Sequence, residues 1–180
     1  LDAQGGRRIL LTAVRRADAP LAPAPWVWQA QPTADHRVPV DLSALLGRIL
    51  AEQQQRRGGA RPVDVELPPS CEIAMTDGPV REALTILVGE LQQGPALGAP
   101  AVVRLVDGAT EVGVELIDPT LVLTDVDVRA IRAGDLTAVG TPLAIVPLVR
   151  ASQLVRDAHA ELTVRSDVDS GTTIRVIVSR

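Results

Sequence analysis

Few residues in this chain of 180 residues have the type and spacing needed for catalysis or metal binding. Its one cysteine, Cys71, excludes an internal disulfide and any metal site made of several cysteines. The two histidines, His36 and His159, form no recognisable triad with a serine and an acid, and no zinc motif is present. The acids of the last third lack calcium-loop spacing and are typical of a solvated loop. They are Asp118, Asp125, Asp127, Asp135, Asp167 and Asp169. We therefore predict no catalytic residue.

The composition removes several kinds of chemistry and of partner. Asn, Lys, Phe and Tyr are absent from the chain, so no site can use their side chains. Their codons are rich in A and T, and a bacterial genome of high GC content accounts for their absence. The hydrophobic content of 46% predicts a folded globule. A net charge of −4 disfavours nucleic acid as a partner.

Residues 1–37 are expected to form an N-terminal arm or linker, which could include the tail of an upstream helix. Prolines interrupt residues 18–34, as is typical of an extended connector. Trp26 and Trp28 lie in it, on one side of an extended chain. They either pack on their own domain or contact a partner protein, and they are our candidate partner contacts. No signal peptide or membrane span is visible. We expect a cytoplasmic location, and a membrane tether upstream of Leu1 is left open.

Hydrophobic periodicity in residues 38–180 predicts an α+β two-layer sandwich. We expect a mixed, mostly antiparallel sheet that is covered on one face by about three helices. Strands are expected at 38–42, 62–67, 71–75, 101–108, 111–118, 161–166 and 172–179, and helices at 43–57, 79–93 and about 147–158. Ser43 is the expected N-cap of the first helix. Residues 119–139 have weak periodicity and are expected to form a long loop, with one helical turn left open.

This order of elements resembles the ATP-binding domain of sensor histidine kinases, which has the GHKL ATPase fold. The stretches that carry the resemblance are PVDLSALL (39–46), REAL (81–84), LAIV (143–146), DAHAEL (157–162) and SGTTIRVIV (170–178). It covers roughly residues 38–179, with a spacing mismatch of a few residues around 147–155. It implies that Asp118 receives the adenine amino group and that Thr173 lies beside this acid and helps hold adenine. It also implies a packing role for His159, whereas His36 precedes a strand near prolines and is typical of a surface loop.

The residues that the family uses for phosphate and magnesium are replaced. Its two asparagine-helix positions correspond to Glu90 and Ile86, and only the carboxylate of Glu90 could ligate Mg²⁺. The first glycine-rich box reads Asp-Pro-Thr-Leu-Val at 118–122, and no Gly-x-Gly occurs in the chain. The second box corresponds to 138–142 and keeps one glycine. If a nucleotide is bound, Gly140 and Thr141 are the residues left to hold its phosphates.

The lid lysines and the phenylalanine of the family are also missing, although Arg129 and Arg132 could supply lid charge. We therefore expect a catalytically degenerate histidine-kinase-like domain that binds partner proteins in bacterial two-component signalling, without a cofactor. One alternative is a divergent but active kinase domain that binds ATP and Mg²⁺ through Glu90 and Asp118. Another is a regulatory binder of the anti-sigma-factor type. A homodimer is left open.

Overall fold

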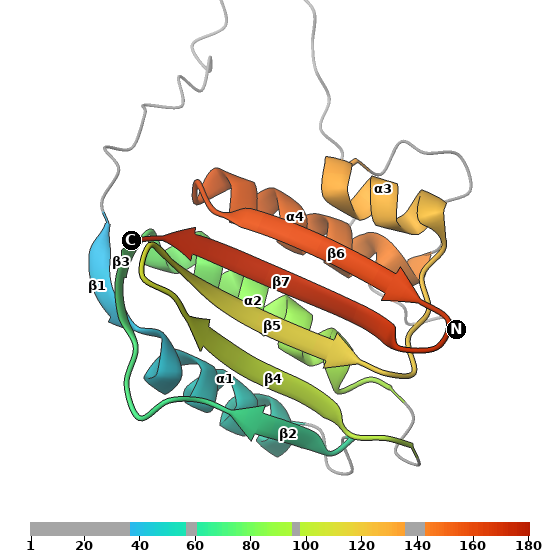
Figure 1. Ribbon diagram of the computed structural model, residues 1–180, viewed down its shortest axis with the longest axis horizontal. Coiled ribbons are helices and arrows are strands. Elements are labelled where there is room, and N and C mark those ends of the chain that lie inside the picture. The colour runs from blue at the N-terminus through green and yellow to red at the C-terminus, as the bar shows by residue number, and fades with distance from the viewer. Residues whose placement is uncertain (1–36, 57–60, 95–97, 136–142) are drawn as a thin grey trace, which may run out of the picture. The chain divides into compact units, whose positions relative to one another are not determined.

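The computed structural model describes residues 37–56, 61–94, 98–135 and 143–180 (Figure 1). The strands are β1 (Val38–Asp41), β2 (Val63–Glu66), β3 (Glu72–Met75), β4 (Ala101–Asp107), β5 (Glu111–Asp118), β6 (Glu161–Asp167) and β7 (Gly171–Ser179). The helices are α1 (Leu42–Arg56), α2 (Asp77–Leu91), α3 (Asp125–Ala133) and α4 (Val146–Asp157), and α4 follows a 3₁₀ turn, η1 (Leu143–Ile145). Five residues singled out in the sequence lie outside the described ranges. They are Trp26, Trp28, His36, Gly140 and Thr141.

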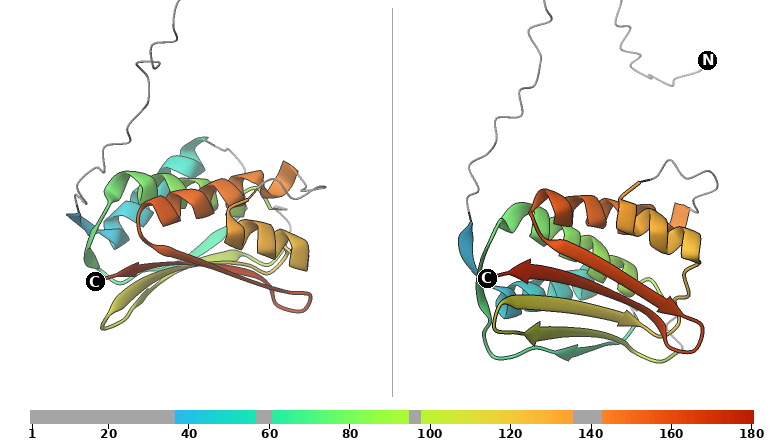
Figure 2. Two further views of the ribbon diagram at one scale, coloured as in Figure 1. Left: turned by 90° about the horizontal axis from the view of Figure 1, so that it is seen from above. Right: turned by 45° about the horizontal axis from the view of Figure 1, so that its top comes forward.

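A five-stranded mixed sheet in the order β2-β4-β5-β7-β6 forms one layer of the domain. Strand β2 runs parallel to β4, and the other neighbouring pairs are antiparallel. Strands β1 and β3 form a separate antiparallel pair. The helices lie on one face of the larger sheet (Figure 2). The predicted α+β fold, with its mostly antiparallel sheet, is therefore confirmed.

The core lies between the sheet and the helices because one face of each strand is apolar. Strand β5 turns Val112, Val114 and Leu116 inward, and all three are buried. Helix α2 buries the predicted stripe of side chains at helical spacing, from Val80 to Leu91. Since side chains alternate along a strand, the inward face of β5 ends at Asp118. The strand thus carries a carboxylate into the layer between sheet and helices.

Helix α1 is capped by Asp41 and not by Ser43, so the predicted cap is wrong. The helix begins at Leu42, one residue earlier than expected. Oδ1 of Asp41 accepts from the backbone N–H groups of Ser43 at 3.0 Å and Ala44 at 3.2 Å, which satisfies two free donors of the first turn. It also accepts from the backbone N–H of Cys71, and this bond is the main cause of a lowered pKa at Asp41.

The segment expected to be a long loop contains a nine-residue helix, α3. The described ranges therefore hold four α-helices, whereas about three were expected. Thr124 caps it, accepting from the backbone N–H of Asp127, and the Asp127 carboxylate accepts in return from the backbone N–H of Thr124. Gly134 ends the helix in the left-handed conformation, with φ of 61°. Asp127 is buried and is therefore not a solvated loop acid. No helix in the described part of the chain is long and apolar enough to cross a membrane.

Candidate functional site

A cavity of about 480 Å³ lies beside the end of β5. Helix α2, the segment after β5, the start of α4 and strand β7 supply its walls. Most of the wall is aliphatic, with Leu87, Leu91, Leu116, Leu121, Leu148 and Ile174 among the lining residues. Three carboxylates also line it, those of Glu90, Asp118 and Asp127. The cavity is therefore an apolar chamber with acidic groups in its wall.

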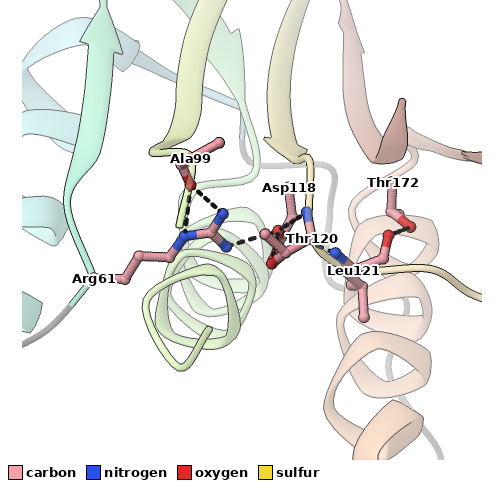
Figure 3. Close-up of polar contacts among 6 residues, drawn as sticks. All are labelled: Arg61, Ala99, Asp118, Thr120, Leu121 and Thr172. Carbon is pink, nitrogen blue, oxygen red and sulfur yellow. Dashed lines mark hydrogen bonds and ion pairs between the residues drawn. The ribbon is translucent and has the colours of Figure 1, made fainter. Parts of the chain in front are cut away.

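Asp118 forms a buried ion pair with Arg61, a residue not singled out by the sequence (Figure 3). Nη1 of Arg61 donates to Oδ1 of Asp118 at 2.7 Å. The side chains of Arg61 and Asp118 are 0% and 8% exposed. Nε and Nη2 of Arg61 donate to the backbone carbonyl of Ala99 at 3.2 and 2.5 Å. The guanidinium is thus held between a loop carbonyl and the acid that lines the cavity.

The same Asp118 oxygen organises the turn that follows β5. Oδ1 accepts from the Thr120 backbone N–H and hydroxyl, both at 2.8 Å, and from the Leu121 backbone N–H at 3.2 Å. Burial raises the pKa of this carboxyl, but the hydrogen bonds from Arg61 and Thr120 outweigh that effect and leave the pKa below its usual value. Asp118 is therefore ionised at neutral pH, and Arg61 compensates its charge.

Two glycines allow this arrangement because side chains would not fit in their places. A Cβ added to Gly94 would lie 2.6 Å from Nη1 of Arg61, so the glycine lets the guanidinium approach. Gly171, at the start of β7, has φ of +77°. A Cβ there would lie 2.2 Å from the backbone oxygen of Asp118. The lack of a side chain at these two positions thus lets the backbone lie close to the ion pair.

A chain of hydroxyl groups fixes the segment between β5 and α3 to strands β6 and β7. The backbone N–H of Leu123 donates to Oγ of Ser166 at 2.8 Å, and Oγ1 of Thr172 donates to the carbonyl of Leu121 at 2.6 Å. The two hydroxyl oxygens lie 2.8 Å apart. Because the proton of Thr172 is already used, Ser166 must donate to Thr172. The linked hydroxyl groups therefore fix the segment at two backbone positions, the carbonyl of Leu121 and the N–H of Leu123.

Strand register puts Thr172 at the cavity in place of the predicted Thr173. Asp118 pairs with Thr172 across the sheet, and Thr172 lines the cavity. Thr173 pairs with Ile117 on the other face, since neighbouring residues of a strand point to opposite sides. The predicted position of Thr173 is therefore wrong by one residue.

The other predicted residues are partly brought together. Glu90 lies on the same cavity as Asp118, and Nε2 of Gln93 donates to its Oε1 at 2.5 Å. Ile86 lines a neighbouring cavity of about 490 Å³ that also reaches Glu90. Arg129 and Arg132 do not line the chamber beside Asp118; Nη2 of Arg132 donates to the carbonyl of Val164 at 2.6 Å.

His159 differs from its predicted packing role. It is exposed in the turn between α4 and β6, with a left-handed φ of 55°. Among the residues whose positions are described, no cluster of three or more His, Cys, Asp or Glu side chains could hold a metal ion. The described wall of the cavity thus contains carboxylates and hydroxyl groups that already donate hydrogen bonds. It contains no basic side chain.

No protein-family profile matches the sequence, and no curated protein matches it. Solved structures do match. The mycobacterial sensor histidine kinase MprB has 15% identity and a TM-score of 0.64, covering 79% of this chain and 97% of that chain. A nucleotide-free catalytic domain of histidine kinase ThkA has 12% identity and a TM-score of 0.65, covering 79% and 96%. The histidine kinase domain of the E. coli osmosensor EnvZ has 18% identity and a TM-score of 0.57, covering 81% and 89%. The protein therefore has the fold of histidine kinase catalytic domains, as the sequence resemblance predicted.

Proposed function

We propose that residues 38–180 form a catalytically degenerate histidine-kinase-like domain, which acts in bacterial signalling by binding other proteins. The observation that carries this proposal is the buried pair of Asp118 and Arg61, 2.7 Å apart. The resemblance assigns Asp118 to the adenine amino group, yet its Oδ1 already accepts from Arg61, Thr120 and Leu121. An adenine ring would therefore meet a carboxylate whose charge is compensated by Arg61 and whose Oδ1 is occupied by the turn after β5.

The site offers still fewer groups that could bind the phosphates of a nucleotide. Glu90, Asp118 and Asp127 line the cavity, and Arg61 compensates one of these three acids. At roughly 8 Å and an effective dielectric constant of about 20, each repulsion between a carboxylate of the wall and a phosphate charge costs about 2 kcal/mol. The segment 136–142, which leads into α4, contains no charged residue. Nor does the chain have glycine loops whose backbone N–H groups could hold a triphosphate.

We expect no binding of ATP or ADP tighter than about 1 mM, with or without Mg²⁺, because the carboxylates of the wall repel phosphate and the sequence lacks glycine-rich phosphate loops. Isothermal titration calorimetry on the full chain measures this directly. A nucleotide-binding protein titrated in the same buffer is the control for sensitivity. A micromolar Kd for ATP would overturn the proposal.

A second candidate function is a divergent kinase domain that retains ATP. The observation in its favour is that Glu90 and Asp118 lie on one cavity, where a carboxylate could reach Mg²⁺ and an adenine could reach Asp118. This candidate requires that ATP binding weakens in Asp118→Asn and that Mg²⁺ dependence is lost in Glu90→Gln. Nucleotide binding that both variants leave unchanged would eliminate it.

A further inference from the structure

The chamber beside Asp118 is larger than the packing of a protein core leaves by chance. Its volume is about 480 Å³, whereas protein interiors hold few voids larger than a water molecule. Pockets that bind small molecules occupy roughly 300–1,000 Å³. The volume of the chamber is therefore that of a small-molecule site and not that of a packing defect.

The inner wall of the chamber is aliphatic. Leu87 on α2, Leu148 on α4 and Ile174 on β7 line it, and all three residues are buried. None of the lining residues that the structure describes is aromatic or basic, so the wall has neither a ring for stacking nor a cation for an anionic ligand. Cavities lined by such side chains bind apolar molecules, because water finds too few polar partners in them.

The buried polar residues of the wall make their hydrogen bonds within the protein. Asp118 and Thr172, at the ends of neighbouring strands, bind the Arg61 guanidinium and the carbonyl of Leu121 (Figure 3). The Asp127 carboxylate accepts from the backbone N–H and the hydroxyl of the α3 cap, at 3.0 and 2.7 Å. A ligand therefore needs no charge to complete the hydrogen bonds of these three groups.

Other lining residues connect the chamber with solvent. Four of them are exposed, namely Gln93, Thr120, Val122 and Ala144. Because an exposed residue that also lines a cavity reaches both, these four residues mark the opening of the chamber. The polar end of a ligand that lies here keeps its contact with water and avoids the cost of burying a polar group.

We propose that the chamber binds an uncharged aliphatic molecule. Its alkyl chain contacts Leu87, Leu148 and Ile174, and its polar end lies at the opening. The affinity comes from burial of methylene groups, whereas an ionised end group loses part of its hydration at the opening and weakens binding. This inference goes beyond the proposed function, because it assigns a ligand class whatever protein the domain binds.

A series of straight-chain alcohols tests the proposal on the full chain. In NMR titrations of 1-butanol, 1-hexanol and 1-octanol, the affinity is expected to rise about fourfold for each added methylene group. Octanoate and octylamine have the same chain with a charged end, and both are expected to bind at least about threefold more weakly than octanol. Affinities that do not depend on chain length, tighter binding of either charged probe, or no saturable binding of octanol at millimolar concentration would overturn the proposal.

Matched variants locate the binding. Ala144→Trp, at an exposed residue of the opening, is expected to weaken octanol binding about tenfold, because the indole ring occupies part of the chamber. Ala51→Trp is the control, since Ala51 is exposed on α1 and does not line the chamber. Octanol affinity that Ala144→Trp leaves unchanged would contradict the assignment.

Methyl resonances give a second test of the location that needs no variant. Octanol is expected to shift the methyl signals of Leu87 and Ile174, whereas Leu46, which is buried outside the lining, should not respond. Shifts that are equal at all three residues would mean that octanol binds elsewhere or perturbs the fold. ATP in a parallel titration tests the proposed function separately.

Discussion

Arg61→Met is expected to lower the free energy of unfolding by about 3–5 kcal/mol, because it leaves a buried carboxylate without its cation. Methionine retains much of the length of arginine but supplies neither charge nor donors to Asp118 and the Ala99 carbonyl. The Arg61 side chain is 0% exposed, so water cannot replace the lost contacts without a rearrangement of the turn. Urea denaturation followed by circular dichroism measures the change.

Arg81→Met is the matched control for this experiment. Arg81 also pairs with an aspartate at 2.7 Å, but Arg81 and Asp77 are 45% and 32% exposed. Solvent screening limits such a pair to about 0–1 kcal/mol. If Arg61→Met cost no more than Arg81→Met, the Asp118 pair would not support the fold as we argue. The double variant Arg61→Met/Asp118→Asn should be more stable than the sum of the single variants predicts.

Loss of stability in Arg61→Met should also depend on pH. The pKa of Asp118 in the folded protein lies below the 3.8 of an unperturbed aspartate, so its contribution is complete above that value and is lost as pH falls toward the folded pKa. Without Arg61, the hydrogen bonds from Thr120 remain but oppose the effect of burial less completely, so the pKa of the Asp118 carboxyl is higher in the variant than in the parent protein. The difference in unfolding free energy between the two proteins should therefore shrink between pH 7 and about pH 3. A difference that stays constant over this range would indicate that packing, and not the charge of Asp118, explains the effect.

Gly171→Ala is expected to destabilise the protein by about 2–5 kcal/mol, through two additive causes. Alanine at φ of +77° pays for a backbone conformation that L-residues disfavour, at roughly 1–2 kcal/mol. The new Cβ would also lie 2.2 Å from the Asp118 backbone oxygen and 2.5 Å from Cα of Pro119, so backbone must move. That shift costs about another 1–3 kcal/mol. Thermal unfolding by calorimetry measures the sum.

The control for this substitution is expected to have the opposite sign. Gly47 lies exposed within α1, and nothing lies within 4 Å of a Cβ added there. Gly47→Ala should stabilise the protein by up to about 1 kcal/mol, because alanine has the higher helix propensity. If both glycine variants changed stability in the same direction, the close approach of Gly171 to the β5 turn would not be the cause.

Local sequence patterns were enough to predict the elements whose buried side chains recur at regular spacing. Strand alternation and the Asp107–Gly108 turn predicted the β4–β5 hairpin, and Pro147 correctly placed the start of α4. Helix α3 was missed because its buried residues are few, with only Ala130 and Ile131 as buried apolar side chains. Its signal was the cap formed by Thr124 and Asp127 with Gly134 at the end, and an aspartate at the third helical position is a weak form of the capping box.

Tertiary pairing accounts for what the sequence could not predict at the site. Arg61 lies 57 residues from Asp118 and follows two glycines and an alanine, so no local periodicity indicates its burial. The error between Thr172 and Thr173 has a related origin. Thr172 and Thr173 are adjacent residues of the same type, so the local sequence does not distinguish them. Only the register between β5 and β7 decides which of the two side chains points inward.

The bond from Arg132 to the Val164 carbonyl lies on the end strand of the five-stranded sheet. Strand β6 is at the end of the five-stranded sheet, and an end strand offers its backbone to any other extended chain. The guanidinium of Arg132 occupies one of those backbone acceptors, and α3 packs beside the strand. A second molecule that adds a strand here must first displace this cation. Helix α3 thus covers part of an edge with which another extended chain could otherwise pair.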